Sequence, residues 1–392
     1  MKKEITIGIF CDAFFPMTDG VIMVVDNYAR RLMKYGNVIV FVPKTNEYYD
    51  DSVLPYTVVR CNSIKVPFMD YSLPIPFFSR DFSKKLKNYN LDIVHIHSPF
   101  TLGSLGIKYS KKHNIPCVAT MHSQFKQDIL RIIKSDTIAT KLNSKLINIF
   151  NKCDQCWAVN QEVANIFYKD YGYKCLPKTM NNATEMLPIK ESKNAIKYIN
   201  KKHQIKANEK VFLFVGRINI LKNILFIADS LKAVKEKRPK LKFKMLYVGC
   251  GQDEEILRNH IQKLQLENEV VMCGKITDRE ELAKYYKRAD LFLFPSIYDA
   301  SSIVQIEAAS QETPGIFLKG AATAGTITDN VNGFLSEHTV GAYSDKIIEV
   351  LENRKLLESV SKNAYLDLYK HWDDAIKEVY DSYVQLINKN NA

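Results

Sequence analysis

The fold is decided by a stretch in the second half of the chain, which reads Val211-Phe212-Leu213-Phe214-Val215-Gly216-Arg217-Ile218-Asn219-Ile220-Leu221-Lys222-Asn223. Its first five residues form a short apolar run typical of a buried parallel strand. The glycine that follows lets the chain turn closely, and two cations then flank a predicted helix start. Ligands of parallel α/β sheets bind beyond the carboxyl ends of the strands. Arg217 and Lys222 therefore suit a diphosphate, although a solvated basic loop would show the same pattern.

Short apolar runs of the same kind recur on both sides of this stretch. They alternate with segments of helical periodicity, such as 27–35 and 105–112, and this alternation predicts βαβ units with parallel sheets. The predicted strands of the first half are 5–10, 38–42, 93–96, 117–120 and 156–159. Those of the second half are 211–215, 244–248, 270–272, 291–294 and 315–318. The sequence thus predicts an α/β protein with two doubly wound, Rossmann-like domains.

The domain boundaries follow from length and from one break in the alternation. The 392 residues exceed the size at which a single core usually stops growing. Residues 186–209 are rich in Lys and Asn and lack long apolar runs. We therefore expect a first domain at 1–185, a linker at 186–209, a second domain at 210–365, and a final helix at 366–392 that returns to the first domain.

Charge is unevenly distributed along the chain. Of the net charge of +12, residues 1–190 carry +9, with 25 Lys and Arg against 16 Asp and Glu. Such asymmetry favours an anionic partner surface, or it reflects lysines that decorate solvated faces. No aromatic-basic module of a known kind occurs, so we expect no nucleic acid as partner.

Neither a membrane span nor a signal peptide is predicted. No stretch approaches the roughly 18 consecutive apolar residues that a span requires. The apolar run at 5–10 is soon followed by Asp12, Thr18 and Asp19, which is unlike a secretory signal. We expect a cytoplasmic protein, with peripheral contact to the inner face of the cell membrane as a further expectation.

A second candidate segment follows the predicted strand 291–294 and reads Pro295-Ser296-Ile297-Tyr298-Asp299-Ala300-Ser301-Ser302-Ile303-Val304-Gln305-Ile306-Glu307. The spacing places Asp299 at the mouth of a loop and Glu307 about one turn inside a helix. A carboxylate that accepts from two vicinal hydroxyls suits a ribose, and the N–H groups of Ser302 and Ile303 at the helix start suit phosphate. Alternatively, Glu307 is a solvated helix residue.

Together the two segments resemble the retaining glycosyltransferases of family 4, which have the GT-B fold. In that family two Rossmann-like domains face each other across a cleft, a Gly-Arg…Lys loop binds the donor diphosphate, and a Glu-x7-Glu motif binds sugar and ribose. Further resembling segments occur in the family's order and read Asp19-Gly20-Val21, Asp92-Ile93-Val94-His95-Ile96-His97-Ser98-Pro99-Phe100, Ile115-Pro116-Cys117-Val118-Ala119-Thr120-Met121-His122-Ser123, Gly249-Cys250-Gly251, Cys273-Gly274-Lys275-Ile276 and Trp372-Asp373.

The resemblance implies which residues form the site. The donor would be bound by Gly20, Arg217, Lys222, Lys275, Ile276, Asp299, Ser302, Ile303 and Glu307. The catalytic residues would be His122, Asp299, Arg217 and Lys222. In these roles the two cations stabilise the leaving diphosphate and Glu307 holds the ribose. Asp299 holds the sugar, His122 contacts sugar or phosphate, and Gly20 allows close approach from the first domain.

The chain departs from the family pattern at three places. Asp299 replaces the first Glu of the motif, Ser301-Ser302 replace Phe-Gly, and Met180-Asn181-Asn182 replace Pro-Asn-Gly. The shorter carboxylate leaves open which sugar fits. The serines would either hydrogen-bond to the donor or cap the helix.

No metal and no cofactor are expected. The pair His95-x-His97 has metal-ligand residue types, but we expect its rings to point to opposite faces of their strand. No Asp-x-Asp sequence is present to chelate a nucleotide-bound metal, and Cys153-Asp154-Gln155-Cys156 has no second pair at zinc-site distance. Arg217 and Lys222 would neutralise the leaving diphosphate instead.

The acceptor side is predicted from residues 124–152, which interleave Lys and Arg with Ile and Leu. A basic amphipathic helix of this kind lies on an anionic membrane surface, or it is a core-facing helix with a solvated basic face. The segment 97–103 resembles family members that glucosylate diacylglycerol. The resemblance implies transfer of a hexose from an NDP-sugar, UDP-hexose, to a lipid or glycan hydroxyl with retention. The alternatives are a GT-B epimerase or phosphorylase and a non-catalytic nucleotide-binding relative.

Overall fold

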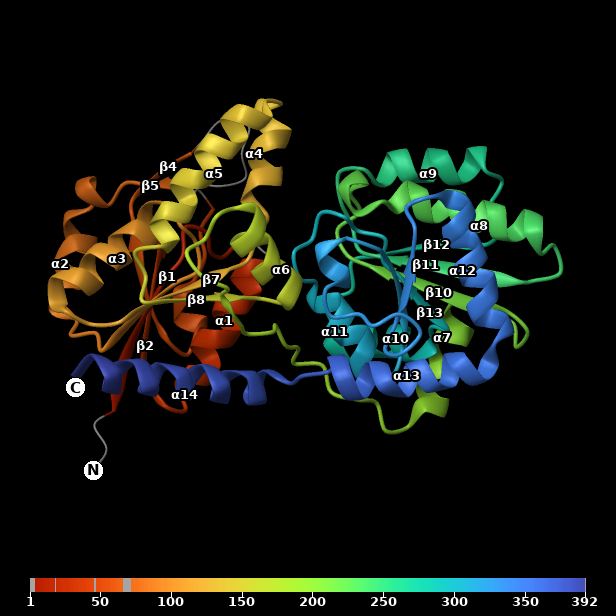
Figure 1. Ribbon diagram of the computed structural model, residues 1–392. Helices are drawn as coiled ribbons and strands as arrows, with labels where there is room; N and C mark the ends of the chain where they lie inside the picture. The colour runs from red at the N-terminus through yellow and green to blue at the C-terminus, as the bar shows by residue number, and fades with distance from the viewer. Residues whose placement is uncertain (1–3, 18, 46, 66–71, 392) are drawn as a thin grey trace. The chain divides into compact units, whose positions relative to one another are not determined.

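The structure, a computed structural model, describes residues 4–17, 19–45, 47–65 and 72–391 (Figure 1). The chain divides into two compact units. Unit 1 comprises Met1–Asn182 with Trp372–Ala392, and unit 2 comprises Ala183–His371. Each unit is built on a parallel β-sheet, so the predicted α/β class with two Rossmann-like domains is confirmed.

Unit 1 has a sheet with strand order β3-β2-β1-β6-β7-β8-β9, in which all neighbours are parallel. The strands are β1 (Ile5–Phe10), β2 (Gly36–Pro43), β3 (Thr57–Cys61), β6 (Ile93–Ile96), β7 (Cys117–Met121), β8 (Gln155–Ala158) and β9 (Lys178–Thr179). A separate antiparallel pair consists of β4 (Ser63–Lys65) and β5 (Ser72–Pro74). Strand order reverses between β1 and β6, and open α/β sheets bind ligands at such a point.

The helices of unit 1 are α1 (Gly20–Leu32), α2 (Arg80–Asn88), α3 (Thr101–His113), α4 (Phe125–Ile133), α5 (Asp136–Phe150), α6 (Gln161–Asn165) and α14 (Trp372–Asn391), with short turns η1 (Asp51–Val53), η2 (Pro76–Phe78) and η3 (Ile166–Asp170). Asp19 caps α1 by accepting the Ile22 N–H at 2.9 Å. The distant α14 packs beside α1 (Figure 1). Its first residue, Trp372, packs edge-on against Tyr28 of α1.

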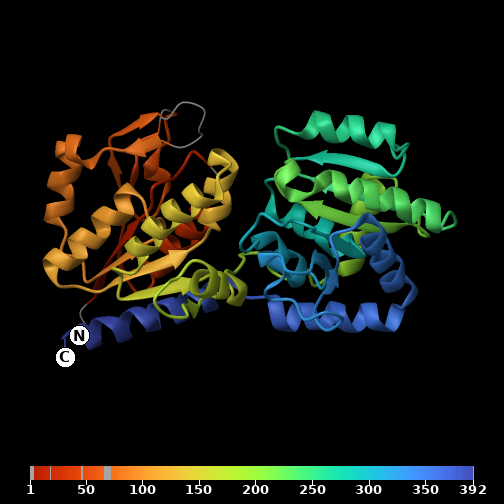
Figure 2. The same ribbon diagram turned by 45° about the horizontal axis from the view of Figure 1, so that its top comes forward.

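Unit 2 has a parallel sheet with strand order β12-β11-β10-β13-β14-β15. The strands are β10 (Lys210–Val215), β11 (Phe243–Val248), β12 (Val270–Gly274), β13 (Leu291–Leu293), β14 (Gly315–Leu318) and β15 (Phe334–Ser336). Helices lie on both faces of this sheet (Figure 2). Its strand order reverses between β10 and β13, which places a second ligand-binding position there.

The helices of unit 2 are α7 (Ser192–Lys202), α8 (Ile224–Lys237), α9 (Glu254–Lys263), α10 (Arg279–Arg288), α11 (Ile303–Ser310), α12 (Val340–Glu352) and α13 (Arg354–Leu368), with short turns η4 (Ile220–Lys222) and η5 (Ala322–Ala324). Residues 186–209 differ from the expected linker, because they belong to unit 2 and contain α7, which packs against α10. Buried Ala195 and Ile199 give α7 an apolar stripe that the Lys- and Asn-rich composition concealed.

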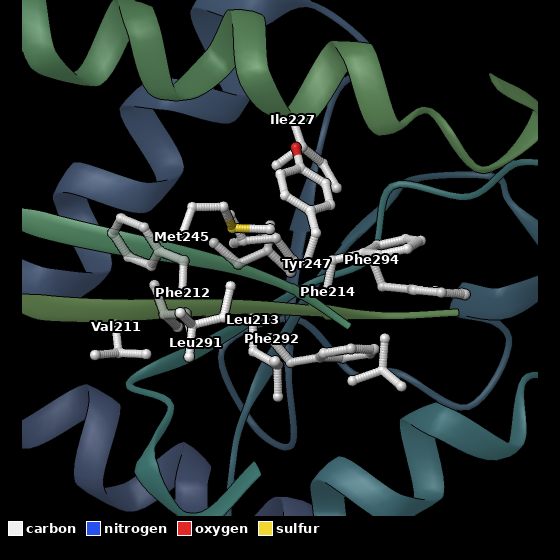
Figure 3. Packing of buried hydrophobic residues seen from close by; sticks show 14 of the residues in the cluster. Val211, Phe212, Leu213, Phe214, Ile227, Met245, Tyr247, Leu291, Phe292 and Phe294 are labelled. Carbon is white, nitrogen blue, oxygen red and sulfur yellow. The ribbon is translucent and has the colours of Figure 1, made fainter. Parts of the chain in front are cut away.

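The core of unit 2 explains why the opening stretch forms a central strand. All of Val211–Phe214 is fully buried, as expected for a strand covered by helices on both faces. Val211 points to one face of the sheet, whereas Phe212 points to the face that also holds Tyr247 and Ile227 of α8 (Figure 3). None of the helices in the described part of the chain combines the length and apolar character needed to span a bilayer.

Candidate active site

Two loops of unit 2 pack backbone against backbone at the carboxyl ends of β10 and β11. The Gly216 N–H donates to the Val248 carbonyl at 3.0 Å. A Cβ at Gly249, whose φ is +140°, would stand 1.9 Å from the Gly216 carbonyl oxygen. Glycine is therefore required at position 249, and the close contact holds the loop at 216–223 against the edge of the sheet.

Arg217 and Lys222 both lie in this loop but have different surroundings. The Lys222 Nζ lies 2.8 Å from each carboxylate oxygen of Asp299 and 5.4 Å from the ring centre of Phe294. Arg217 is exposed, and no residue in the described ranges forms an ion pair with it. The loop thus presents one cation that is already paired and one that is available to a ligand.

Asp299 follows β13 and is held in place by its own loop. The Ser296 hydroxyl donates to Asp299 Oδ2 at 2.7 Å. The side chains of Lys222 and Asp299 are only 17% and 20% exposed. Because β10 and β13 are neighbours, the pair stands at the point where the strand order reverses. The structure therefore brings together two residues that the sequence assigned to different parts of the donor.

Glu307 is buried in α11, with 3% of its surface exposed. The Arg279 guanidinium donates to Oε1 at 2.5 Å, and the Tyr286 hydroxyl donates to Oε2 at 2.9 Å. Burial raises the pKa of Tyr286 well above its usual value, so this hydroxyl keeps its proton and remains a donor. The alternative that Glu307 is a solvated helix residue is wrong.

Arg279 and Tyr286 are residues that sequence reasoning missed. They lie seven positions apart on α10 and therefore on one face of that helix. The Arg279 Nε also lies 3.3 Å from Glu185 Oε1, so the guanidinium stands between two carboxylates. The helical spacing was visible in the sequence, but no local signal indicates that this face meets Glu307.

The remaining predicted donor residues of unit 2 lie at the start of α11 and after β12. Ser302 occupies the N-cap position, yet its hydroxyl accepts no capping hydrogen bond, which does not support a capping role. Ile303 is the first residue of that helix. Lys275 is exposed and Ile276 is half-buried directly after β12. These roles in binding stay predictions.

In unit 1 three histidines gather at the carboxyl ends of β6 and β7. His122 Nε2 lies 2.9 Å from His97 Nδ1, with the two rings stacked. His95 lies between two hydroxyls, that of Tyr383 at 2.5 Å and that of Thr120 at 2.7 Å. Burial lowers the pKa of each histidine, that of His122 to about 3, so the three rings are neutral near pH 7.

The expectation that His95 and His97 point to opposite faces is wrong. Their ring centroids are 4.1 Å apart, because residues i and i+2 of a strand share a face. Within the described residues no group of three or more His, Cys, Asp or Glu side chains is arranged to hold a metal ion. Cys153 and Cys156 of the CxxC pattern are buried free thiols.

Asp12 is a second buried group that sequence reasoning missed. It follows β1, accepts the Leu102 N–H at 2.7 Å, and accepts the Ser98 hydroxyl at 2.6 Å. These bonds fix the start of α3 and the turn after β6. Asp12 therefore stabilises the backbone from which His97 extends.

Gly20 is the exposed first residue of α1. A Cβ at this position would meet no atom within 4 Å. Packing within the described chain therefore does not require glycine here. The expected close approach of a ligand to Gly20 stays a prediction.

Comparison with known proteins agrees with this geometry. Residues 18–178 match the model for Glycosyltransferase Family 4, and residues 196–367 match the model for Glycosyl transferases group 1. The α-monoglucosyldiacylglycerol synthase of Streptococcus pneumoniae is 26% identical over 94% of this chain and 86% of its own length. The enzyme of the same name from Acholeplasma laidlawii is 25% identical over 98% of both chains.

Solved structures show the same architecture. HepE of Anabaena, in complex with UDP, superposes with a TM-score of 0.77 at 15% identity, covering 97% of this chain and all of that one. HepE with UDP-glucose gives a TM-score of 0.75 at 16% identity, covering 97% of this chain and all of that one. Each half of the chain thus matches one glycosyltransferase family model, and the whole chain superposes on glycosyltransferase structures. The protein is a glycosyltransferase with the GT-B fold, whose first half belongs to glycosyltransferase family 4 and whose second half belongs to the glycosyl transferases group 1.

Proposed function

We propose that this enzyme transfers a hexose from a UDP-hexose to a hydroxyl group of a membrane lipid, with retention at the anomeric carbon. The observation that carries the proposal is the set of charged groups where the sheet order of unit 2 reverses. There the exposed Arg217, the Lys222–Asp299 pair and the buried Glu307 follow neighbouring elements of one sheet. The synthases of S. pneumoniae and A. laidlawii, matched over nearly the whole chain, support the lipid acceptor by name.

The diphosphate is bound by Arg217, Lys222 and the N-terminus of α11. The guanidinium has five donors that suit phosphate oxygens, and the N–H groups of Ser302 and Ile303 begin a helix whose dipole favours an anion. Lys222 exchanges Asp299 for phosphate when the donor binds. The released Asp299 is then free to accept hydroxyls of the sugar. No metal is needed in this scheme, because the two cations neutralise the leaving diphosphate.

The nucleoside is bound through Glu307. Each oxygen of its carboxylate accepts one hydrogen bond within unit 2. A carboxylate offers about four acceptor positions, so two remain for the ribose hydroxyls. Arg279 and Tyr286 fix the carboxylate before the ligand arrives, which lowers the entropy cost of binding. Lys275 and Ile276 contact the base, and on unit 1 Gly20 and His122 contact the phosphate and the sugar.

The acceptor is delivered from the membrane by the α4–α5 surface, which we define as the exposed side chains of Leu130, Arg131, Ile132, Ile133, Lys134, Ile138 and Lys141. α5 buries a stripe that includes Ala139 and Ile147, so this stripe is explained by packing within unit 1, whereas Ile138 on the same helix is 49% exposed. α4 is different: among its residues only Phe125 is buried, and Ile132 is 67% exposed. Exposed isoleucines beside lysines suit the interface of an anionic bilayer. The enzyme would therefore work at the inner face of the cell membrane.

Labelled UDP-glucose with vesicles of a bacterial lipid extract tests the reaction. We expect label in the lipid fraction with the wild-type enzyme and at least tenfold less with Arg217→Ala, since a charge-assisted hydrogen bond contributes about 1.5–3 kcal/mol. Label in a free rearranged or phosphorylated sugar would instead show an epimerase or phosphorylase. Release of no labelled product from any UDP- or GDP-hexose, with UDP affinity unchanged in Arg217→Ala, would indicate a non-catalytic relative.

Vesicle sedimentation tests the membrane contact separately. We expect binding to anionic vesicles but weak binding to phosphatidylcholine vesicles. The double variant Ile132→Ser/Ile133→Ser should bind anionic vesicles about thirtyfold more weakly, because each partly buried isoleucine contributes ~1 kcal/mol. Leu366→Ser is the matched control, since Leu366 is 72% exposed but belongs to unit 2. Equal losses in both variants would contradict the assignment.

A further inference from the structure

Two imidazoles of unit 1 form a direct hydrogen bond. His97 Nδ1 and His122 Nε2 are 2.9 Å apart, so one of these nitrogens carries a proton and the other does not. Burial lowers the pKa of both rings, and neither is an imidazolium. Each ring therefore has one N–H and one bare nitrogen. Only two arrangements of protons satisfy the bond.

The far nitrogen of His97 distinguishes these arrangements. His97 is 2% exposed, and its Nε2 has no hydrogen-bond partner in the described part of the structure. If His122 donates, then His97 must carry its proton on Nε2, which leaves a buried N–H without a partner. If His97 donates, Nε2 holds only a lone pair. Buried N–H groups without a hydrogen-bond partner are rarer than buried acceptors without one, and they destabilise the folded state more.

The surroundings of His97 do not offset that cost. Its ring packs edge-on to Tyr28, with centroids 5.2 Å apart, and an aromatic face is a much weaker acceptor than oxygen or imidazole. Its own N–H on the main chain donates to the Phe10 carbonyl at 2.9 Å, which fixes the backbone after β6. His97 is thus held by both its backbone and its ring.

We propose that His97 is a positioning residue that donates from Nδ1 to His122 Nε2 and thereby fixes the His122 proton on Nδ1. Among the described residues no group other than His97 hydrogen-bonds to His122. His122 is half-buried, so its Nδ1–H is available to an oxygen of a bound molecule. His122 then acts as a neutral hydrogen-bond donor, and neither of its nitrogens is free to act as a base.

This inference rests on the proposed function for the identity of the oxygen that His122 reaches. With a sugar nucleotide bound, that oxygen is a hydroxyl oxygen of the sugar. A neutral donor suits a hydroxyl that is not ionised in the reaction. A group other than His122 must therefore accept the proton that the acceptor hydroxyl loses during transfer.

The position of the proton can be measured without any activity. Long-range proton–nitrogen NMR on protein with isotope-labelled histidine separates Nδ1–H from Nε2–H rings, and the His122 signals are those lost in His122→Asn. We expect the Nδ1–H form in the wild type and in His97→Asn, whose side-chain amide can donate in place of Nδ1. His97→Asp offers only acceptors, so His122 should move its proton to Nε2. His260, which contacts Asp229 in unit 2, is the internal reference.

Kinetics give a second readout. His97→Asp should lower kcat for sugar transfer about tenfold with a smaller change in UDP affinity, whereas His97→Asn should retain most of the activity; one hydrogen bond contributes about 1.4 kcal/mol. If His97→Asp does not fold, His97→Leu replaces it and should give a mixture of both His122 forms. An Nε2–H signal for His122 in the wild type overturns the inference. If the wild type transfers no sugar, the proposed function fails, while the NMR result still decides the proton position.

Discussion

The two units place different chemistry at equivalent points of their sheets. In unit 2 the reversal of strand order between β10 and β13 holds charged groups, namely the Lys222–Asp299 pair and the exposed Arg217. In unit 1 the reversal between β1 and β6 leads to a neutral cluster of the buried His95 and His97 with the half-buried His122. The contrast indicates a division of labour. Positive charges suit a diphosphate, whereas neutral hydrogen-bond donors suit a sugar, whose hydroxyls are recognised by directional hydrogen bonds.

Removing a cation from the charged side should have the largest effect. We expect Lys222→Ala to lower kcat by about 10²–10³-fold, because a preorganised group that stabilises developing negative charge contributes roughly that factor. Steady-state transfer from UDP-hexose measures it. Lys287→Ala is the control, since Lys287 pairs with Glu312 elsewhere in unit 2. A loss of less than threefold in Lys222→Ala would contradict the assigned role.

Acid should destabilise the neutral side. The folded His122 has a pKa of about 3, so below pH ~6.5 the unfolded chain binds more protons, and stability falls as pH falls. At pH 5 this histidine alone should cost about 2 kcal/mol of unfolding free energy, from 1.36 kcal/mol per pKa unit. Both tryptophans, Trp157 and Trp372, belong to unit 1, so their fluorescence in urea reports that unit.

The matched variant for acid sensitivity is His122→Asn, which cannot titrate. Its stability should fall less between pH 7 and pH 5 than that of the wild type. Parallel pH dependence in the two proteins would show that the titration of His122 does not matter.

Weakening the buried carboxylate should have an intermediate effect. Glu307→Gln keeps the shape and the acceptor for Tyr286 but removes the charge opposite Arg279. We expect UDP affinity to fall about tenfold, since hydrogen bonds to charged groups contribute about 1.5–3 kcal/mol. Calorimetric titration with UDP measures this, and Glu312→Gln, which also loses a salt bridge, should bind as the wild type does.

The smallest predicted effect is an increase in UDP affinity, whereas Lys222→Ala lowers the rate and Glu307→Gln lowers the affinity. Asp299→Asn releases Lys222 from its carboxylate partner, so UDP should bind several-fold more tightly, by up to about 1 kcal/mol. Transfer of the sugar should nevertheless slow, because Asp299 also accepts sugar hydroxyls in the proposed complex. Weaker UDP binding in Asp299→Asn would show that the pair supports the site rather than competing with the ligand.

The fold could be predicted because its central strands are apolar throughout. A short run of consecutive apolar residues, such as 211–215, is typical of a strand that is buried on both faces of a sheet. The edge strands β3, β9 and β15 were not predicted, since they are short or mixed in polarity. The sequence of α7 favours a linker, because its apolar stripe is narrow and set among lysines.

The site could be predicted only in part. Position after a strand identified Arg217, Lys222 and Asp299, because strand ends are visible in the sequence. His122 and Gly20 came from family resemblance alone. Side-chain pairs such as Arg279–Glu307 and His97–His122 join residues 28 and 25 positions apart. Such contacts depend on how helices and strands register in three dimensions, and no local pattern encodes them.

The division of labour between the units is tested most directly by calorimetric titration of UDP into two variants. UDP carries the diphosphate but no sugar. Arg217→Ala should therefore bind UDP at least tenfold more weakly than the wild type, whereas His122→Asn should bind it within about twofold. If His122→Asn lost UDP affinity and Arg217→Ala kept it, the assignment of charge to the diphosphate and of the neutral histidine to the sugar would be contradicted.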